Sequence, residues 1–258
     1  MSHRQRRADP RRFLDLGLRT NPFVEIPPND LSGGLPPPYR AADLLDSRWK
    51  AIQILGHCGS GKTTHLVYVG AHLSERLSPC QWHLLTSDGQ RPGPHTQRPL
   101  CRPGQADGVL DLSPWTSARA LLIDEAQRLD RRGRNELATW CRDDPERRLV
   151  VATHEDLRPS LERCGPILSV ELGHPDLGYY QSLYDARIAR ARRTAGSDFP
   201  IEPEALDAAL RHSSWRPRRF IVLLYFVFES IDRPGPVTLD RIEVALDEAL
   251  DFLRHDPE

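Results

Sequence analysis

Lysine is almost absent from this chain of 258 residues, although basic residues are not. Of the 35 lysine and arginine residues, only Lys50 and Lys62 are lysine. Because arginine carries nearly all the positive charge, the position of each lysine is informative. The formal net charge of -1 provides no overall attraction to nucleic acid or to an anionic membrane, so such a partner would have to be bound by a local patch.

Long apolar runs and cysteine frameworks are lacking as well. The longest apolar run, 220–228, is too short to span a bilayer, and no apolar signal-peptide segment follows the basic N-terminus. The five cysteines show neither CxxC nor Cys/His ligand spacing, which excludes an evident disulfide framework or zinc site. The sequence therefore predicts a soluble protein of the reducing cytoplasm that does not engage a membrane.

Hydrophobic periodicity divides the chain into three parts. Residues 1–48 form a leader rich in Arg, Pro and Gly, whose helix-breaking residues disfavour long regular elements. Between 49 and 174, nearly all-apolar strands alternate with helices, as is typical of a parallel sheet covered on both faces. Only helical patterns remain in 175–258. We therefore expect an α/β core, a parallel sheet sandwiched by helices, followed by a small all-helical lid.

The individual elements expected from periodicity can be stated by residue range. Strands are expected at 51–55, 81–85, 120–123 and 148–152. Helices are expected at 61–77, 132–141, 176–194, 203–212, 217–231 and 238–254. The stretch 88–114, which is rich in Gly, Pro, Gln and Arg and shows no period, is expected to be a long loop.

Residues 56–63 read GHCGSGKT and satisfy the phosphate-loop pattern GxxxxGK[ST]. They lie between an expected strand and an expected helix, which is the context that a phosphate site requires. Glycines allow backbone N–H groups to turn toward the phosphates, Lys62 can reach the β and γ oxygens, and the Thr63 hydroxyl can bind Mg²⁺. The residues predicted to bind ATP are Gly56, His57, Cys58, Gly59, Ser60, Gly61, Lys62, Thr63 and Thr64.

An apolar strand that ends in two adjacent carboxylates follows in LLIDEAQ, at 121–127. Because the carboxyl ends of parallel strands meet at one edge of a sheet, Asp124 and Glu125 are expected beside the phosphate loop. Asp124 and Thr63 would then hold Mg²⁺, while Glu125 would polarise the attacking water as general base. The two motifs together predict binding and hydrolysis of ATP, with binding alone as an alternative.

The next expected strand delivers Thr153 and His154 to the same edge. Either side chain could hydrogen-bond the γ-phosphate or the attacking water. Thr153 is preferred because a hydroxyl can donate at any working pH, whereas His154 must carry a proton on the nitrogen that faces the phosphate. A cap or turn at the end of the strand is the alternative interpretation for both residues.

These segments resemble the AAA+ superfamily of P-loop NTPases, and within it the initiator-like branch that includes origin-recognition ATPases and bacterial transposition-associated ATPases. The resemblance spans about 21–231 and implies a homo-oligomer with ATP at its subunit interfaces. The matching segments are NPF at 21–23, the phosphate loop, LLIDEAQRL at 121–129, VVATHEDL at 150–157 and WRPRR at 215–219.

The resemblance also implies roles for residues outside the phosphate loop. Thr153 or His154 stands where a sensor-1 residue would stand, and Arg218 looks like the sensor-2 arginine of the lid. The segment 157–172 is similar to the one that carries an arginine finger, for which Arg163 is the first candidate and Arg158 the second. For each arginine the alternative is a solvated surface residue.

The function expected from the sequence is an ATP-driven oligomeric switch that recruits another protein or DNA, in a DNA-transaction or mobile-element setting. The alternative is a regulatory or signalling nucleotide switch that binds only protein. The sequence leaves the choice between these partners open.

Overall fold

A computed structural model of the chain describes residues 10–24, 38–44, 48–77, 80–86, 89–92, 117–194 and 198–255. Contacts divide the chain into two compact units, which are described separately below. The sheet unit comprises most of the chain up to Gly173, and the helical unit combines the first described segment with the residues from His174 onward. Among the described residues, no helix has both the length and the apolar character needed to cross a membrane.

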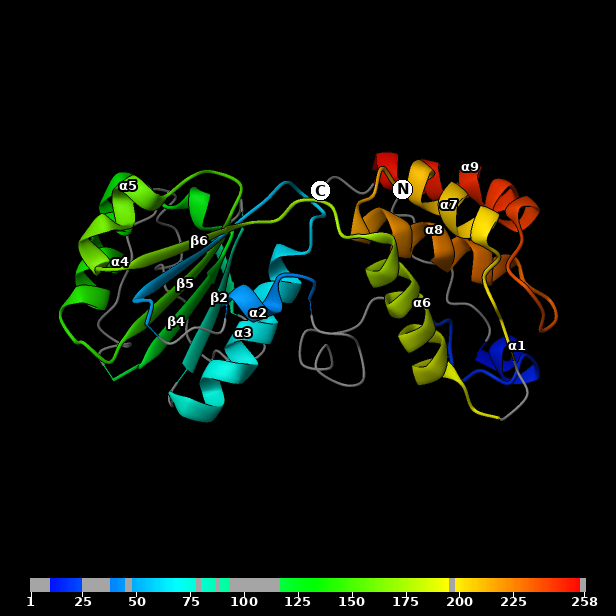
Figure 1. Ribbon diagram of the computed structural model, residues 1–258, viewed down its shortest axis with the longest axis horizontal. Helices are drawn as coiled ribbons and strands as arrows, with labels where there is room; N and C mark the ends of the chain where they lie inside the picture. Colours follow the sequence, from blue (N-terminus) through cyan, green and yellow to red (C-terminus); the bar gives the residue numbers. More distant parts are fainter. Residues whose placement is uncertain are drawn as a thin grey trace. The chain divides into compact units, whose positions relative to one another are not determined.

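Within the described residues, six strands form one sheet in the order β3-β2-β4-β5-β1-β6 (Figure 1). The strands are β1 (Ala51–Leu55), β2 (Cys80–Thr86), β3 (Gly89–Pro92), β4 (Ala120–Asp124), β5 (Arg148–Thr153) and β6 (Ile167–Glu171). All neighbouring strands are parallel except β2 and β3, which pair antiparallel. The predicted α/β fold with a parallel sheet is confirmed.

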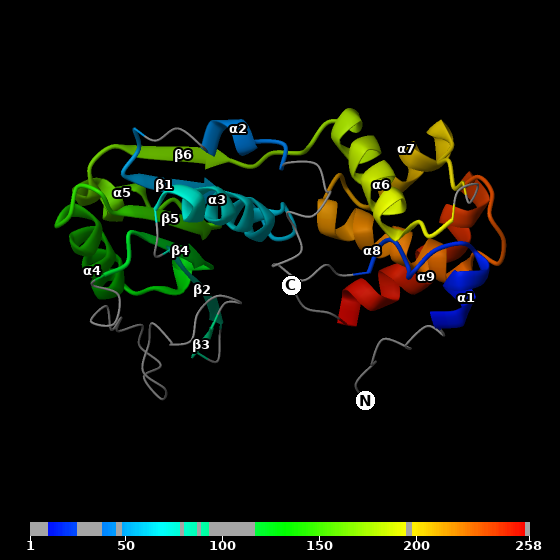
Figure 2. The same cartoon turned by 90° about the horizontal axis from the view of Figure 1, so that it is seen from below.

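One face of the sheet is covered by α2 (Ala41–Leu44) and α3 (Lys62–Arg76), as Figure 2 shows. Alternate strand residues point to this face, where Ile52 and Leu122 pack in the same buried cluster as Leu66 of α3. The apolar stripe of α3 therefore fixes the helix against the strand that leads into it.

The opposite face is covered by α4 (Arg131–Arg142) and by α5 (Arg158–Leu161). Leu121 and Val151 share a second buried cluster there with Leu137 of α4. Because consecutive residues of each strand face opposite clusters, the central strands must be apolar on both faces, as their sequences predicted.

Two strands differ from the expectations drawn from the sequence. β3 lies inside 88–114, so the prediction of a loop is wrong for residues 89–92; the part from 93 to 114 lies outside the described residues. An edge strand is held by backbone hydrogen bonds to one neighbour and needs no apolar alternation, so its sequence resembled a loop. β6 was not predicted at all, although it extends the sheet beside β1.

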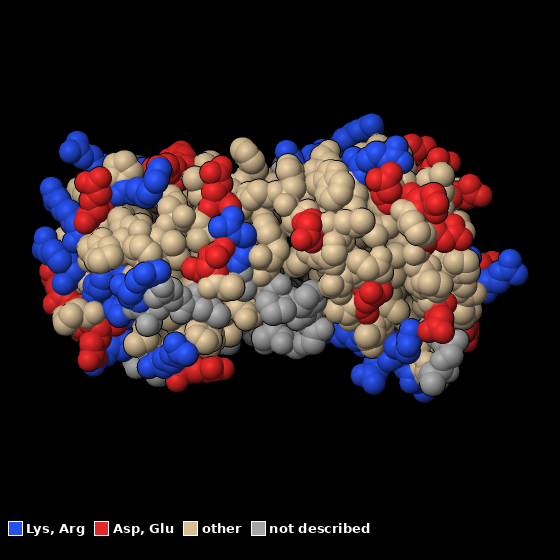
Figure 3. All heavy atoms as spheres, viewed as in Figure 1, with Lys and Arg blue, Asp and Glu red and all other residues tan. Residues whose placement is uncertain are grey.

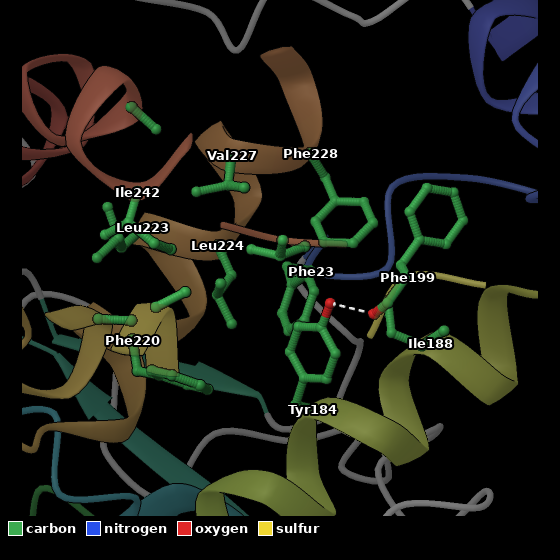
Figure 4. Packing of buried hydrophobic residues seen from close by; sticks show 14 of the residues in the cluster. Phe23, Tyr184, Ile188, Phe199, Phe220, Leu223, Leu224, Val227, Phe228 and Ile242 are labelled. Atoms are coloured by element: carbon green, nitrogen blue, oxygen red, sulfur yellow. Dashed lines mark hydrogen bonds between the residues drawn. The ribbon is translucent and has the colours of Figure 1, made fainter. Parts of the chain in front are cut away.

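The helical unit has α8 (Pro217–Ser230) at its centre, and the predicted C-terminal helices are confirmed. Phe220, Leu224 and Phe228 of α8 are fully buried (Figure 4), so the all-apolar run of this helix forms the core of the unit. The other helices of the unit, as far as the structure describes it, are α1 (Pro10–Asp15), α6 (Leu177–Ala191), α7 (Pro203–His212) and α9 (Leu239–His255).

The NPF segment anchors the leader to this unit. Phe23 is buried between Tyr184 and Phe228, with ring centroids 5.5 and 5.3 Å away (Figure 4). The side-chain amide of Asn21 donates to Glu229 at 2.8 Å, and the Asn21 side-chain oxygen accepts from the backbone N–H of Phe23 at 2.9 Å. The leader segment 10–24 is therefore an integral part of the helical core.

A buried arginine completes this anchor. The Arg187 guanidinium donates to the carbonyls of Pro22 (3.3 Å) and Val24 (3.0 Å) and lies 5.9 Å from the ring centre of Phe23. Burial lowers the pKa of Arg187 to about 10. The chain on both sides of Phe23 is thus held by one side chain of α6.

We expect Phe23→Ala to lower the free energy of unfolding by about 3–5 kcal/mol, because it empties a filled site in the core. Leu14→Ala is the matched control on the same leader, since Leu14 is 41% exposed and should change stability by less than about 0.5 kcal/mol. Chemical denaturation of both variants measures the difference. Equal losses would contradict the anchoring role of Phe23.

Candidate nucleotide-binding site

Three adjacent strands bring the predicted motifs to one edge of the sheet. β4, β5 and β1 are neighbours in that order and end at Asp124, Thr153 and Leu55. Leu55 pairs with Thr153, and the next residue, Gly56, donates its backbone N–H to the Thr153 carbonyl at 3.1 Å. The parallel register therefore places the phosphate loop beside the ends of β5 and β4.

Glycine is required at two points of the loop for different reasons. A Cβ atom at Gly56 would lie 2.5 Å from the Ser60 hydroxyl oxygen and 3.1 Å from Leu172 Cβ, so a side chain does not fit. Gly61 precedes α3 with φ 89°, in the left-handed region that disfavours other residues. The loop thus folds back closely on itself before the helix begins.

The loop presents donors toward its own interior. Lys62 is buried, and its ammonium donates to the His57 carbonyl at 3.1 Å. The Ser60 hydroxyl is buried and has no hydrogen-bond partner in the part of the chain that the structure describes. A buried ammonium and an unsatisfied hydroxyl at the start of α3 fit the oxygens of a bound phosphate. His57 and Cys58 are exposed on the loop, and Thr64 is half-buried.

The two predicted magnesium ligands contact each other. The Thr63 hydroxyl donates to Asp124 Oδ2 at 2.6 Å, while Asp124 Oδ1 accepts from the backbone N–H of Glu125 at 3.0 Å. Burial raises the pKa of Asp124, and the hydrogen bond from Thr63 opposes that shift. Two adjacent oxygen ligands at the phosphate loop suit Mg²⁺, which takes its remaining ligands from phosphate oxygens and water.

Glu125 begins the turn that follows β4. Its backbone has φ 57°, in the left-handed region, and it precedes the short 3₁₀ helix η3 (Ala126–Arg128). Its carboxylate accepts from the Gln127 side-chain amide at 2.5 Å and lies 3.8 Å from Arg128 Nε. The predicted general base thus lies next to Asp124, and its carboxylate is held by side chains of the turn that follows it.

Thr153 and His154 both lie at the end of β5, as predicted. Thr153 is fully buried, and its hydroxyl donates to the Glu155 carbonyl and accepts from the Glu155 N–H, both at 3.0 Å. His154 is exposed. The Thr153 hydroxyl therefore bonds within the turn at the end of β5, which is the alternative that the sequence left open for it. A sensor role for Thr153 or His154 stays a prediction.

The predicted arginines have different surroundings. Arg158 forms a forked ion pair with Asp156, at 2.6 Å from Nη2 and 2.9 Å from Nε, which holds the pKa of that carboxyl well below its usual range. Arg163 is exposed on η4 (Glu162–Cys164) and has no ion pair with any residue in the described ranges. Arg218 is exposed on α8 of the helical unit, and its sensor-2 role stays a prediction.

His65 was not singled out from the sequence but braces the phosphate loop. Its ring is buried, and Nδ1 donates at 2.8 Å to the carbonyl of Gly61, the residue that precedes α3. Burial lowers the pKa of His65 to about 4, so the ring is neutral at physiological pH. The ring of Tyr39 packs edge-on against it at 5.1 Å. Its position four residues after a loop glycine was the available clue.

Gln53 is a second residue that the sequence reasoning missed. Its fully buried amide donates to Ser169 Oγ at 2.8 Å and to Asp156 at 3.1 Å, and it accepts from the backbone N–H of Leu157 at 2.6 Å. It therefore connects β1 with β6 and with the segment after β5. A lone amide inside the apolar strand AIQIL was the clue.

The fold is similar to that of several solved structures. Domain III of the replication initiation protein DnaA from Thermotoga maritima matches 88% of this chain and 94% of its own, with a TM-score of 0.55 and 17% identity. The Walker-type ATPase PABY2304 of Pyrococcus abyssi matches 84% of this chain and 71% of its own, with a TM-score of 0.53 and 13% identity.

A single-substitution variant of RuvB from Thermotoga maritima matches 85% of this chain and 67% of its own, with a TM-score of 0.51 and 22% identity. No family description and no curated protein sequence matches the chain. The structural likeness shows that the chain shares the P-loop α/β fold of these proteins, a parallel sheet with flanking helices followed by C-terminal helices.

The low pKa of His65 predicts a pH effect on stability. Between pH 6.5 and about 4 the unfolded chain binds a proton that folded His65 does not, so this residue makes stability fall as the pH falls through that window. We expect His65→Leu to flatten the pH dependence of the free energy of unfolding there. Denaturant titrations of parent and variant at several pH values measure it, and parallel curves would contradict the assignment.

Proposed function

We propose that this chain binds ATP with Mg²⁺ through residues 56–64 and hydrolyses it. The observation that carries the proposal is the 2.6 Å contact between Thr63 and Asp124, which joins the phosphate loop to the strand that ends in Glu125. Lys62 would leave the His57 carbonyl and donate to phosphate oxygens, while Glu125 would accept a proton from the attacking water. Bound Mg²⁺ would neutralise charge on the β and γ oxygens.

We further propose that the protein works as a nucleotide-dependent homo-oligomer in which one subunit completes the site of another. Arg163 supports this proposal, because an exposed arginine without a partner carboxylate among the described residues is available to a neighbouring ATP. Arg158 is less suitable, because its forked ion pair with Asp156 would have to break first. An arginine finger contributes about 10³–10⁵ in rate to phosphoryl transfer.

Two classes of partner are proposed for this switch, DNA and another protein. Likeness in fold to a domain of a replication initiation protein supports a DNA-transaction role and the initiator-like branch. On the face shown in Figure 3, however, acidic and basic side chains are interspersed. A switch that binds only protein is therefore the second candidate. ATPase rates measured with and without duplex DNA distinguish the two.

Glu125→Gln is expected to lower kcat about 10²–10⁴-fold while ATP binding persists, because the amide cannot accept the proton. Lys62→Ala should instead weaken ATP binding at least about tenfold, through loss of charge-assisted hydrogen bonds. Glu75→Gln, on the exposed surface of α3, is the control and should retain parental values. Binding is read with a fluorescent ATP analogue and turnover by phosphate release. Unchanged turnover in Glu125→Gln would remove Glu125 from the mechanism.

Arg163→Ala is expected to reduce ATPase activity about 10³-fold or more if its guanidinium acts on a neighbour's ATP. Mixing Arg163→Ala with Lys62→Ala subunits should then restore activity. The Arg163→Ala subunit has an intact phosphate loop, and the Lys62→Ala subunit supplies the Arg163 side chain to it. Arg158→Ala is the matched variant and should retain more activity than Arg163→Ala. Failure of the mixture to regain activity, in oligomers shown by size measurement to contain both subunits, would exclude action in trans.

A further inference from the structure

Glu125 is attached to the end of a rigid strand, yet its side chain would be free to rotate without further contacts. β4 is buried along its whole length and ends at Asp124. The left-handed backbone of Glu125 turns the chain into η3, so that Gln127 returns toward the carboxylate. Its side-chain Nε2 donates to Glu125 Oε2 at 2.5 Å. Arg128 Nε lies 3.8 Å from the same oxygen and is a weaker, more exposed contact.

The turn that carries Gln127 is itself held in place from α4. Arg134 donates through Nη2 to the Gln127 main-chain carbonyl at 2.8 Å and through Nε to the Leu129 carbonyl at 2.8 Å. The same guanidinium lies 3.3 Å from the Glu155 carboxylate. Because the backbone of Glu155 bonds the Thr153 hydroxyl, Arg134 connects the end of β4 with the end of β5.

Only the NH2 end of the Gln127 side-chain amide has a hydrogen-bond partner among the described residues. Its carbonyl oxygen, Oε1, is buried without a hydrogen-bond partner among the residues that the structure describes. The amide orientation with Nε2 toward Glu125 is the one that avoids two facing acceptors. Among the described residues, the hydrogen bond of the Gln127 side chain therefore goes to the Glu125 carboxylate.

From these contacts we infer that Gln127 is the positioning residue for Glu125: its amide fixes the carboxylate in the orientation from which it accepts the proton of water. This inference rests on the proposed ATP hydrolysis. It adds a role for the fourth residue of the DEAQ segment and for Arg134, which holds the turn beneath it.

Gln127→Ala should lower kcat on the order of 10- to 100-fold while leaving the affinity for ATP and the unfolding midpoint near parental values, because misplacing a catalytic group slows chemistry without loosening the phosphate site. Gln127→Glu has the same size but cannot donate when ionised. A carboxylate at this position would repel the Glu125 carboxylate that Gln127 Nε2 contacts, so Gln127→Glu should also lower kcat.

The decisive measurement is the double variant. If Gln127 acts through Glu125, the variant combining Glu125→Gln with Gln127→Ala should turn over at the rate of Glu125→Gln alone, whereas independent effects would multiply. Arg132→Ala, an exposed position on α4, is the control and should match the parent.

The outcomes separate the two proposals. A parent protein that binds no ATP or releases no phosphate overturns the proposed function. A parent that hydrolyses ATP while Gln127→Ala retains its kcat, or a double variant whose losses multiply, overturns the role of Gln127 and leaves the function standing.

Discussion

The hydrogen bond from Thr63 to Asp124 is the contact on which the proposed chemistry depends. It joins the first turn of α3 to the last residue of β4, two elements that are separated by 61 positions in sequence. Its geometry follows from the parallel register, since β5 lies between β4 and β1 and fixes both strand ends. Burial of the carboxylate in this contact favours a bound cation beside it, because an ionised group in an apolar environment requires a compensating charge.

Much of this arrangement could be predicted from the sequence because its causes are local. The apolar strands, the glycines of the phosphate loop and the acidic strand end each follow from short-range requirements, and the strand-helix order then brings them together at one edge. The C-terminal helices were predictable for the same reason, since their apolar positions recur at helical spacing.

What could not be predicted depends on distant partners. β3 and β6 are edge strands, whose pairing is set by an available neighbour more than by their own composition. The buried amide of Gln53 acts through Asp156 and Ser169, residues more than a hundred positions away. The Gln127 contact was within two residues of a predicted site, but it required the left-handed backbone of Glu125, which no sequence pattern announces.

The anchoring of Phe23 has a mechanical consequence. Its segment belongs to the helical unit, whereas Ala41–Leu44 packs on the sheet unit, so the chain passes between the units before the sheet as well as after it. Within the helical unit, Arg187 bonds the carbonyls on both sides of Phe23, so a shift of α6 along its axis would pull directly on the backbone of the leader.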